Sequence, residues 1–195
     1  MPHKQFVSPF IHWQEVPQHN QIKSILLPRI HNHNKQHGKR DVGNALTTFF
    51  TPLNDNASIL DKDLVNDIIW KQFDKMIEEL QLYPTITESF LKHIWYNVYD
   101  PGDYAIAHSH TNADFCGMYL LDCPADNNTL FHHNISSTSY PFDMGAYTTE
   151  HIKEGNVLFW PSYLMHSATP CKTERTVVVF NITSDYIFDA EDHTH

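Results

Sequence analysis

Apolar residues recur at a helical period between residues 58 and 82. A spacing of three or four positions places side chains on one face of an α-helix, so this stretch predicts an amphipathic helix. Ser58 followed by Asp61 resembles a capping box, and Pro84 lies just beyond the expected end. We expect this helix to brace a sheet rather than to carry function. Its apolar positions are Leu60, Leu64, Ile68, Ile69, Phe73, Met76, Ile77 and Leu80.

After residue 88 the pattern changes to short apolar and β-branched runs that are separated by turns, such as the sequence at residues 100–103. Short strands at intervals of roughly 8–12 residues, with no helical stretch between them, predict a closed sandwich or jelly roll. Residues 134–146 are rich in Ser, Thr, Tyr and Pro and predict a long loop. The predicted strands are residues 94–99, 104–110, 115–121, 129–133, 147–152, 157–160 and 175–183.

The N-terminal part shows a weaker pattern. Residues 5–30 carry short apolar runs that Pro9, Pro17 and Pro28 interrupt, which predicts short strands or extended arms. Residues 31–45 are polar and predict an exposed loop. The histidines of this loop that we expect to be solvated are His31, His33 and His37.

Length, charge and cysteine content narrow the class of protein. The 195 residues suffice for one domain, for which we expect arms and a helix over residues 1–88 and a β core over residues 89–185. Three cysteines without CxxC spacing argue against a zinc ribbon and favour reduced thiols in the cytoplasm. No apolar run resembles a signal peptide or a membrane span, so we expect no membrane association. The net charge of −10 argues against nucleic acid as a partner.

Candidate metal ligands stand in the predicted β core. His108 and His110 are two positions apart, so in a strand both side chains point to one face, about 6.5 Å apart along the backbone. His166 would complete the set from another strand, which is a usual way to build a facial three-ligand site with open positions. Gly102 precedes the pair at a predicted turn, and residues 155–161 form an apolar strand that ends in a proline.

Arg175 lies nine residues beyond His166, across the turn sequence at residues 169–174. That distance suits the next strand returning beside the same cavity. A planar guanidinium is suited to bidentate recognition of a carboxylate. The alternative is a surface arginine that pairs with Glu174.

These segments together resemble the Fe(II)- and 2-oxoglutarate-dependent oxygenase superfamily, and most closely a branch common in bacteria and bacteriophages. The resemblance covers residues 95–181, nearly half of the chain. It implies a mainly β protein, a double-stranded β-helix or cupin-like jelly roll, to which residues 58–82 would add an N-terminal helical brace. The matching segments are Trp95-Tyr-Asn97, His108-Ser-His110, Cys116-Gly-Met-Tyr119, residues 155–162, His166-Ser, Glu174-Arg175 and Phe180-Asn181.

The resemblance also implies a chemistry. Fe(II) would be held by His108, His110 and His166, and 2-oxoglutarate would chelate the iron and anchor its far carboxylate on Arg175. Oxygen and 2-oxoglutarate would then hydroxylate an unidentified small-molecule or peptide substrate. The protein would position the reactants, exclude water and tune the metal, while the cofactor supplies the hard chemistry.

Two departures from the family pattern matter. The superfamily usually carries Asp or Glu at the position of His110, and an imidazole there leaves the site one charge more positive. Many members carry a hydroxyl two residues after the arginine, where this chain has Val177. Tyr99 and Tyr119 are our candidates for a replacement hydroxyl that completes the carboxylate pocket.

Two asparagines are further candidates for the lining of the cavity. Asn97 shares a strand face with Tyr99, and Asn181 shares one with Arg175. Each of them could equally be ordinary strand polarity. The candidates for binding the cosubstrate are Arg175, Tyr99, Tyr119 and Asn97.

Two other functions fit parts of the same pattern. Gly102, His108, His110 and Asp114 resemble the first cupin motif, with Asp where Glu is usual. A cupin metalloenzyme would use Asp114 as a fourth ligand and would not need 2-oxoglutarate. The chain could also be a non-catalytic jelly roll with a structural metal, but such metals usually have closed coordination.

Overall fold

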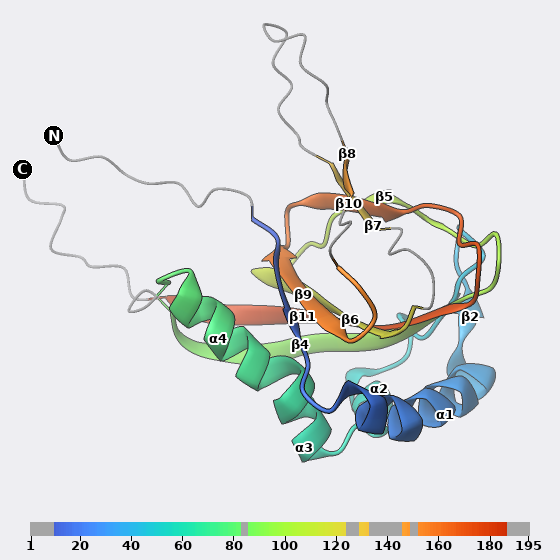
Figure 1. Ribbon diagram of the computed structural model, residues 1–195, viewed down its shortest axis with the longest axis horizontal. Coiled ribbons are helices and arrows are strands. Elements are labelled where there is room, and N and C mark those ends of the chain that lie inside the picture. The colour runs from blue at the N-terminus through green and yellow to red at the C-terminus, as the bar shows by residue number, and fades with distance from the viewer. Residues whose placement is uncertain (1–9, 83–85, 124–128, 133–145, 149–151, 187–195) are drawn as a thin grey trace, which may run out of the picture.

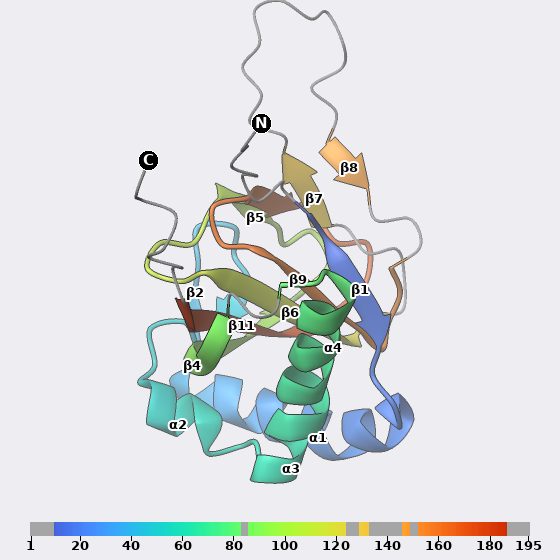
Figure 2. The ribbon, with the colours of Figure 1, turned by 90° about the vertical axis from the view of Figure 1, so that its left-hand side faces the viewer.

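Two antiparallel β-sheets face each other in this computed structural model, and helices cover the outer face of the larger sheet (Figures 1 and 2). The structure describes residues 10–82, 86–123, 129–132, 146–148 and 152–186. The two facing sheets confirm the predicted mainly β jelly roll with a helical brace.

Within the described residues, the larger sheet has seven strands and the smaller sheet has four. In sheet order, the larger sheet contains β1 (His12–Glu15), β9 (Asn156–Pro161), β6 (Phe115–Asp122), β11 (Arg175–Tyr186), β4 (Ile86–Tyr99), β3 (Leu46–Thr47) and β2 (Lys39–Arg40). The smaller sheet contains β5 (Ala105–His108), β10 (Met165–Ala168), β7 (Thr129–His132) and β8 (Ala146–Thr148).

Most predicted strands are present, with shifted ends. β4 begins at Ile86, eight residues before the predicted start at 94, and β8 spans Ala146–Thr148, at the start of the strand predicted at residues 147–152, of which residues 149–151 lie outside the described part. The short strand β10, which carries His166, was not among the predicted strands. The predicted loop over residues 134–146 lies outside the described residues as far as residue 145.

The helix α1 (His19–His37) replaces the predicted arms and the first part of the predicted loop, so both predictions were wrong there. Ile22, Leu26 and Ile30 recur at a spacing of four and are buried on one face. Pro28 within the helix removes one backbone hydrogen bond. Burial of the apolar face outweighs that loss. The short strand β1, which pairs with β9, does agree with an extended arm.

The histidines of this helix differ in exposure. His37 is exposed, as predicted, and His31 is half-buried with its Nε2 3.2 Å from Thr176 Oγ1. His33 is buried and its Nε2 lies 2.9 Å from Asn56 Oδ1, so the prediction of a solvated loop histidine was wrong for it.

The predicted helix over residues 58–82 begins later than expected. It follows α2 (Leu53–Ala57) and consists of α3 (Lys62–Val65), the π-helical turn η1 (Asn66–Trp70) and α4 (Lys71–Glu79). The cap is Asp61, whose Oδ1 accepts the Leu64 N–H at 2.9 Å. The Ser58 hydroxyl instead donates to the Asp55 carbonyl oxygen, at 2.6 Å.

Side-chain alternation in the larger sheet separates two apolar clusters. In β6, Phe115 and Tyr119 pack with the helices, whereas Cys116 and Met118 face the smaller sheet. β4 and β11 divide in the same way, with Trp95 among the side chains that face inward. The space between the two sheets is therefore lined by alternate residues of these strands.

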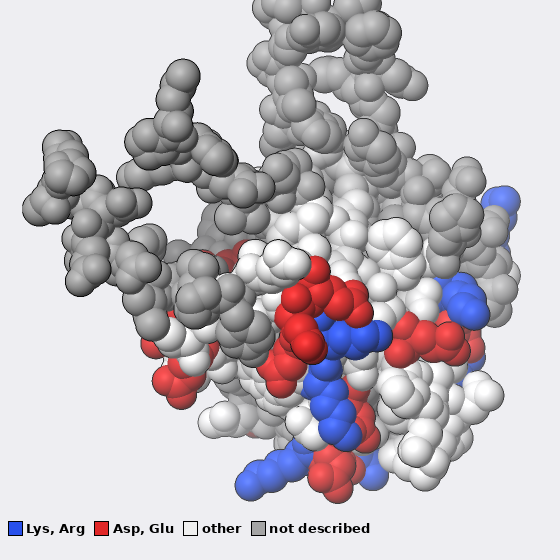
Figure 3. Space-filling view, turned by 60° about the vertical axis from the view of Figure 1, so that its left-hand side comes forward, with Lys and Arg blue, Asp and Glu red and all other residues white. Residues whose placement is uncertain are grey.

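The surface carries charges of both signs. On the face in Figure 3, basic side chains lie among acidic ones. Lys23 of α1 contacts Asp122 at 2.7 Å and Glu154 at 2.6 Å, which ties this helix to β6 and to the turn before β9. No described helix is long and apolar enough to span a membrane.

Candidate metal centre

A cavity of about 370 Å³ opens between the two sheets. Its walls include His108, His110 and His166 as well as Arg175 and Trp95. A cavity of this size can enclose a small organic ligand. The residues that the sequence singled out therefore share one enclosed space.

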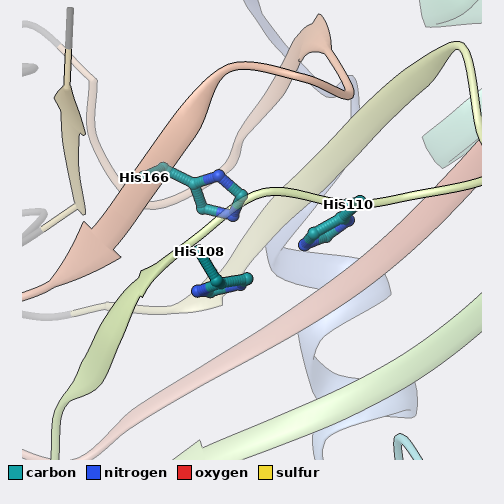
Figure 4. A group of neighbouring side chains, drawn as sticks. All are labelled: His108, His110 and His166. Atoms are coloured by element: carbon teal, nitrogen blue, oxygen red, sulfur yellow. The ribbon is translucent and has the colours of Figure 1, made fainter. Parts of the chain in front are cut away.

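The three histidines converge from two paired strands and one connecting segment (Figure 4). His108 ends β5 and lies directly opposite His166 of β10 in the sheet register. His110 lies two residues beyond His108, where its N–H donates to the Ser162 carbonyl oxygen at 3.0 Å. One potential ligand atom from each ring lies within 4.8 Å of the other two.

Hydrogen bonds place the ring proton of two histidines on Nδ1. His108 Nδ1 lies 2.7 Å from the Ile106 carbonyl oxygen, and His166 Nδ1 lies 3.0 Å from the Leu164 carbonyl oxygen. A carbonyl oxygen only accepts hydrogen bonds, so each Nδ1 must carry the donated proton. The Nε2 atom of each neutral ring then keeps a lone pair for a metal.

Burial keeps two of the rings neutral. Desolvation lowers the pKa of His110 to about 4 and the pKa of His166 to about 3. Both imidazoles are therefore unprotonated at pH 7, which is the state that binds metals. Three neutral nitrogen ligands with no protein carboxylate would leave the full dipositive charge of a bound metal for anionic ligands to balance.

Arg175 begins β11 and is only 4% exposed. Its Nη2 donates to Thr129 Oγ1 at 2.9 Å, and its Cζ lies 5.4 Å from the centre of the Tyr99 ring. Among the described residues, Nε and Nη1 have no hydrogen-bond partner. A buried cation with unused donors is costly unless an anion meets it.

The alternative of a surface arginine paired with Glu174 is wrong. Arg175 points into the cavity, and the Glu174 carboxylate instead lies 3.8 Å from Nε2 of His31.

The other residues that we predicted to bind the cosubstrate lie on different faces of the larger sheet. Tyr99 and Asn97 line the cavity, and the Asn97 amide donates to the Tyr99 hydroxyl at 3.3 Å. Tyr119 lies on the opposite face of the larger sheet, where its hydroxyl is 2.6 Å from His19 Nδ1. The structure therefore does not bring Tyr119 to this cavity. Thr129 is a hydroxyl residue that the sequence analysis missed, because no motif marks it.

Asp114 does not join the three histidines. Its Oδ2 accepts the Ser184 N–H at 2.8 Å. Among the described residues, the group with metal-binding geometry contains only His108, His110 and His166. The Asp114 carboxylate, which a cupin site would use as its fourth ligand, is therefore hydrogen-bonded to the backbone and does not lie with the histidines.

The turn predicted at Gly102 is present, and a second glycine turn lies at Gly155. Gly102 has φ of 96° and its N–H donates to the Cys171 carbonyl oxygen at 2.8 Å. Gly155 has φ of 88° and its N–H donates to the Leu120 carbonyl oxygen at 2.9 Å. Positive φ favours glycine, so each residue allows the turn that leads into a strand of the site.

Comparison with known proteins agrees with this geometry. Residues 93–181 match the family described as "Putative 2OG-Fe(II) oxygenase". The matched segment, a little under half of the chain, is therefore similar to Fe(II)/2-oxoglutarate oxygenases. This segment contains the three histidines and Arg175. No curated protein matches the sequence.

Solved structures of similar fold include three prolyl hydroxylases. The collagen prolyl hydroxylase of Paramecium Bursaria Chlorella virus-1, in complex with 2-oxoglutarate, has a TM-score of 0.57 at 12% identity, with 90% of this chain and 95% of that chain covered. The Pseudomonas putida prolyl-4-hydroxylase has a TM-score of 0.58 at 11% identity, with coverage of 89% and 92%. A Trichoplax adhaerens prolyl hydroxylase bound to a hypoxia inducible factor peptide fragment has a TM-score of 0.58 at 12% identity, with coverage of 93% and 84%. At these identities the similarity shows the shared fold.

Fe(II) and 2-oxoglutarate are the cofactor and the cosubstrate of this oxygenase superfamily. The residues present fit both groups. Three imidazoles offer nitrogen lone pairs of the kind that iron accepts, and the unused N–H groups of buried Arg175 suit a carboxylate.

Proposed function

We propose that this protein is a dioxygenase that uses Fe(II) and 2-oxoglutarate to hydroxylate a C–H bond of a small-molecule or peptide substrate. The observation that supports this proposal is that three converging imidazoles and a buried arginine with unused N–H donors open onto one cavity. A structural metal site would not need the arginine.

In this proposal the Nε2 atoms of His108, His110 and His166 bind the metal. The Nδ1–H bonds to Ile106 and Leu164 hold two of the rings in the required tautomer before the metal arrives. Because the protein would supply only three ligands, a bound metal would keep further coordination positions for the cosubstrate and oxygen.

Arg175 binds the far carboxylate of 2-oxoglutarate in this scheme. Arg175 lines the cavity, and its Nε and Nη1 have no hydrogen-bond partner among the described residues. A carboxylate could bind in a bidentate manner to Nη2 together with one of these two unused donors. Thr129 holds Nη2 and Tyr99 packs against the guanidinium, so these two residues fix the orientation of the fork. Thr129 thereby supplies a hydroxyl beside the guanidinium even though Val177 replaces the usual one.

The remaining residues shape the reaction space. When bound, Fe(II), 2-oxoglutarate and oxygen would supply the oxidation. 2-Oxoglutarate would become succinate and carbon dioxide, with one atom of O2 entering succinate and the other entering a substrate C–H bond. Trp95 and Trp160 line the cavity and help to exclude water from it. Phe49, Phe50 and Ile106 are exposed at the same cavity and offer an apolar surface to a substrate.

The decisive experiment is an anaerobic titration of the Fe(II)-loaded protein with 2-oxoglutarate. We expect a weak visible charge-transfer band that saturates at one 2-oxoglutarate per iron. His166→Ala should abolish iron binding, whereas His132→Ala should not, because His132 bonds Ser167 Oγ and is not one of the converging histidines. Iron binding without the band would contradict the proposed use of 2-oxoglutarate.

A further inference from the structure

The three histidines of the metal centre are held in two different ways. His108 and His166 each bond the carbonyl oxygen of the residue two positions earlier, so their own strands orient them. His110 lies beyond the end of β5 and has no such local bond among those of the described residues. Its Nδ1 instead lies 2.7 Å from Oδ1 of Asn181, a residue 71 positions away on β11.

Asn181 is well placed to orient this ring. It is 8% exposed and lies on the face of β11 that lines the cavity, next to Cys116 of β6 in the sheet register. The Cys116 sulfur lies 3.4 Å from Asn181 Oδ1 and 2.9 Å from His110 Nδ1. Asn181 Oδ1 can accept hydrogen bonds from both neighbours, the Cys116 S–H and the His110 Nδ1–H.

The direction of this hydrogen bond decides whether His110 can bind a metal. An amide oxygen that faces the ring requires the proton on Nδ1, which leaves the lone pair on Nε2. The opposite orientation of the amide would place its NH₂ group against Nδ1 and move the ring proton to Nε2. His110 occupies the position where the superfamily usually carries a carboxylate, and a carboxylate ligand needs no tautomer control.

We propose that Asn181 is a positioning residue that fixes the tautomer and orientation of His110 and thereby sets the affinity of the metal centre. This inference rests on the ligand set of the proposed function. Asn181 acts through the ring and does not itself bind the metal. Asn181 of β11 thus orients the His110 ring, whereas nearby backbone carbonyl oxygens orient the rings of His108 and His166.

The first test uses the metal-free wild-type protein and needs no activity. Ring ¹⁵N chemical shifts in a long-range ¹H–¹⁵N spectrum distinguish the two tautomers of a neutral histidine. We expect His110 to carry its proton on Nδ1 at pH 7. A proton on Nε2 in the wild-type protein would overturn the proposal, whether or not the protein proves to be an oxygenase.

The second test measures Co(II) affinity in three variants. Asn181→Leu removes the acceptor and should weaken Co(II) binding by roughly 10–100-fold, the usual cost of losing an outer-sphere partner. Asn181→Asp keeps an oxygen acceptor at the same place, so it should retain the Nδ1 proton and bind Co(II) at least as tightly as the wild type. Thr183→Val is the matched control, because it makes a similar polar-to-apolar change two residues away on β11.

The outcomes separate this inference from the proposed function. Wild-type affinity in Asn181→Leu would overturn the positioning role while leaving the histidine ligands intact. An equal loss in Asn181→Leu and Thr183→Val would also overturn it, since the effect would then be general to the strand. Failure of the wild-type protein to bind Co(II) or 2-oxoglutarate would instead contradict the proposed function.

Discussion

Arg175 is the residue that most directly links the cavity to a carboxylate cosubstrate. Arg175→Ala should weaken 2-oxoglutarate binding by about one to two orders of magnitude, because a charge-assisted bidentate contact contributes roughly 1.5–3 kcal/mol. Arg175→Lys should restore little of the affinity, since an ammonium group cannot reproduce the planar fork. The measurement is the 2-oxoglutarate dissociation constant, together with succinate formation in the absence of substrate.

Iron content is the control for this comparison. The guanidinium is not a metal ligand, so the wild type and both Arg175 variants should bind iron equally. Unchanged 2-oxoglutarate affinity in Arg175→Ala would show that the unused donors of this buried arginine serve another purpose.

A substitution of Asp114 tests whether this residue is a metal ligand, as a cupin-type site would require. Its carboxylate accepts the Ser184 N–H and does not lie with the converging histidines. Asp114→Ala should therefore leave metal affinity nearly unchanged, although it costs stability by removing an acceptor from a backbone N–H, about 1–3 kcal/mol. His110→Ala should lose the metal. Comparing the Co(II) dissociation constants of the two variants decides the matter, and equal losses would favour a cupin-type site.

The sequence could predict the residues of this site only where a motif or a spacing marks them. The three histidines and Arg175 stand at recognisable intervals, and all four line the cavity. Residue spacing does not show which face of β6 lines the cavity. Tyr119 was predicted to line it, but the side chain packs with the helices on the other face. Thr129 of the smaller sheet lies beside Arg175 of the larger sheet because the two sheets face each other, and no local pattern encodes that contact.

At the scale of elements, the strands of the core were easier to predict than the N-terminal helix. Continuous apolar runs mark β6 and β9, whose residues are buried on both faces. The helix α1 was missed because Pro28 and a polar second half hide the three apolar positions that it buries. Tertiary burial, rather than helix propensity, makes that segment helical.

The start of α3 provides a test at this scale. Asp61 caps the helix through the Leu64 N–H, whereas the Ser58 hydroxyl bonds a carbonyl oxygen in the preceding turn. Asp61→Ala should reduce the free energy of unfolding by roughly 0.5–2 kcal/mol. Ser58→Ala should change it by much less, because its hydrogen bond is exposed. Urea unfolding of both variants makes the comparison, and a larger loss for Ser58→Ala would contradict the assigned cap.

The larger sheet has two different environments on its two faces: the apolar core under the helices and the cavity between the sheets. The sequence alone does not show how these two environments lie relative to each other. Alternate residues of β4, β6 and β11 pack with the helices on one side and line the cavity on the other. This arrangement buries His110 and His166 deeply enough to keep them neutral. The burial that prepares the site for a metal must therefore also make the stability of the metal-free protein depend on pH.

The sign of that dependence follows from the pKa values. In the folded protein the pKa of His110 is about 4 and the pKa of His166 is about 3, both below the ordinary histidine pKa of 6.5. As the pH falls below 6.5, the unfolded chain takes up protons at these two positions while the folded chain does not. The free energy of unfolding therefore decreases between pH 6.5 and about pH 4, and by pH 5 each ring accounts for a loss of about 1–2 kcal/mol.

Urea unfolding of the metal-free protein at pH 7 and pH 5 measures this loss. His166→Gln removes one of the two rings, so its stability should fall less than that of the wild type over the same interval. His132→Gln removes a histidine outside the converging group and should keep the wild-type difference. Because the comparison uses differences between pH values, the unequal starting stabilities of the variants cancel. An equal fall in the wild type and His166→Gln would mean that burial at the cavity does not hold this imidazole neutral, and the argument that the site is ready for a metal at pH 7 would fail with it.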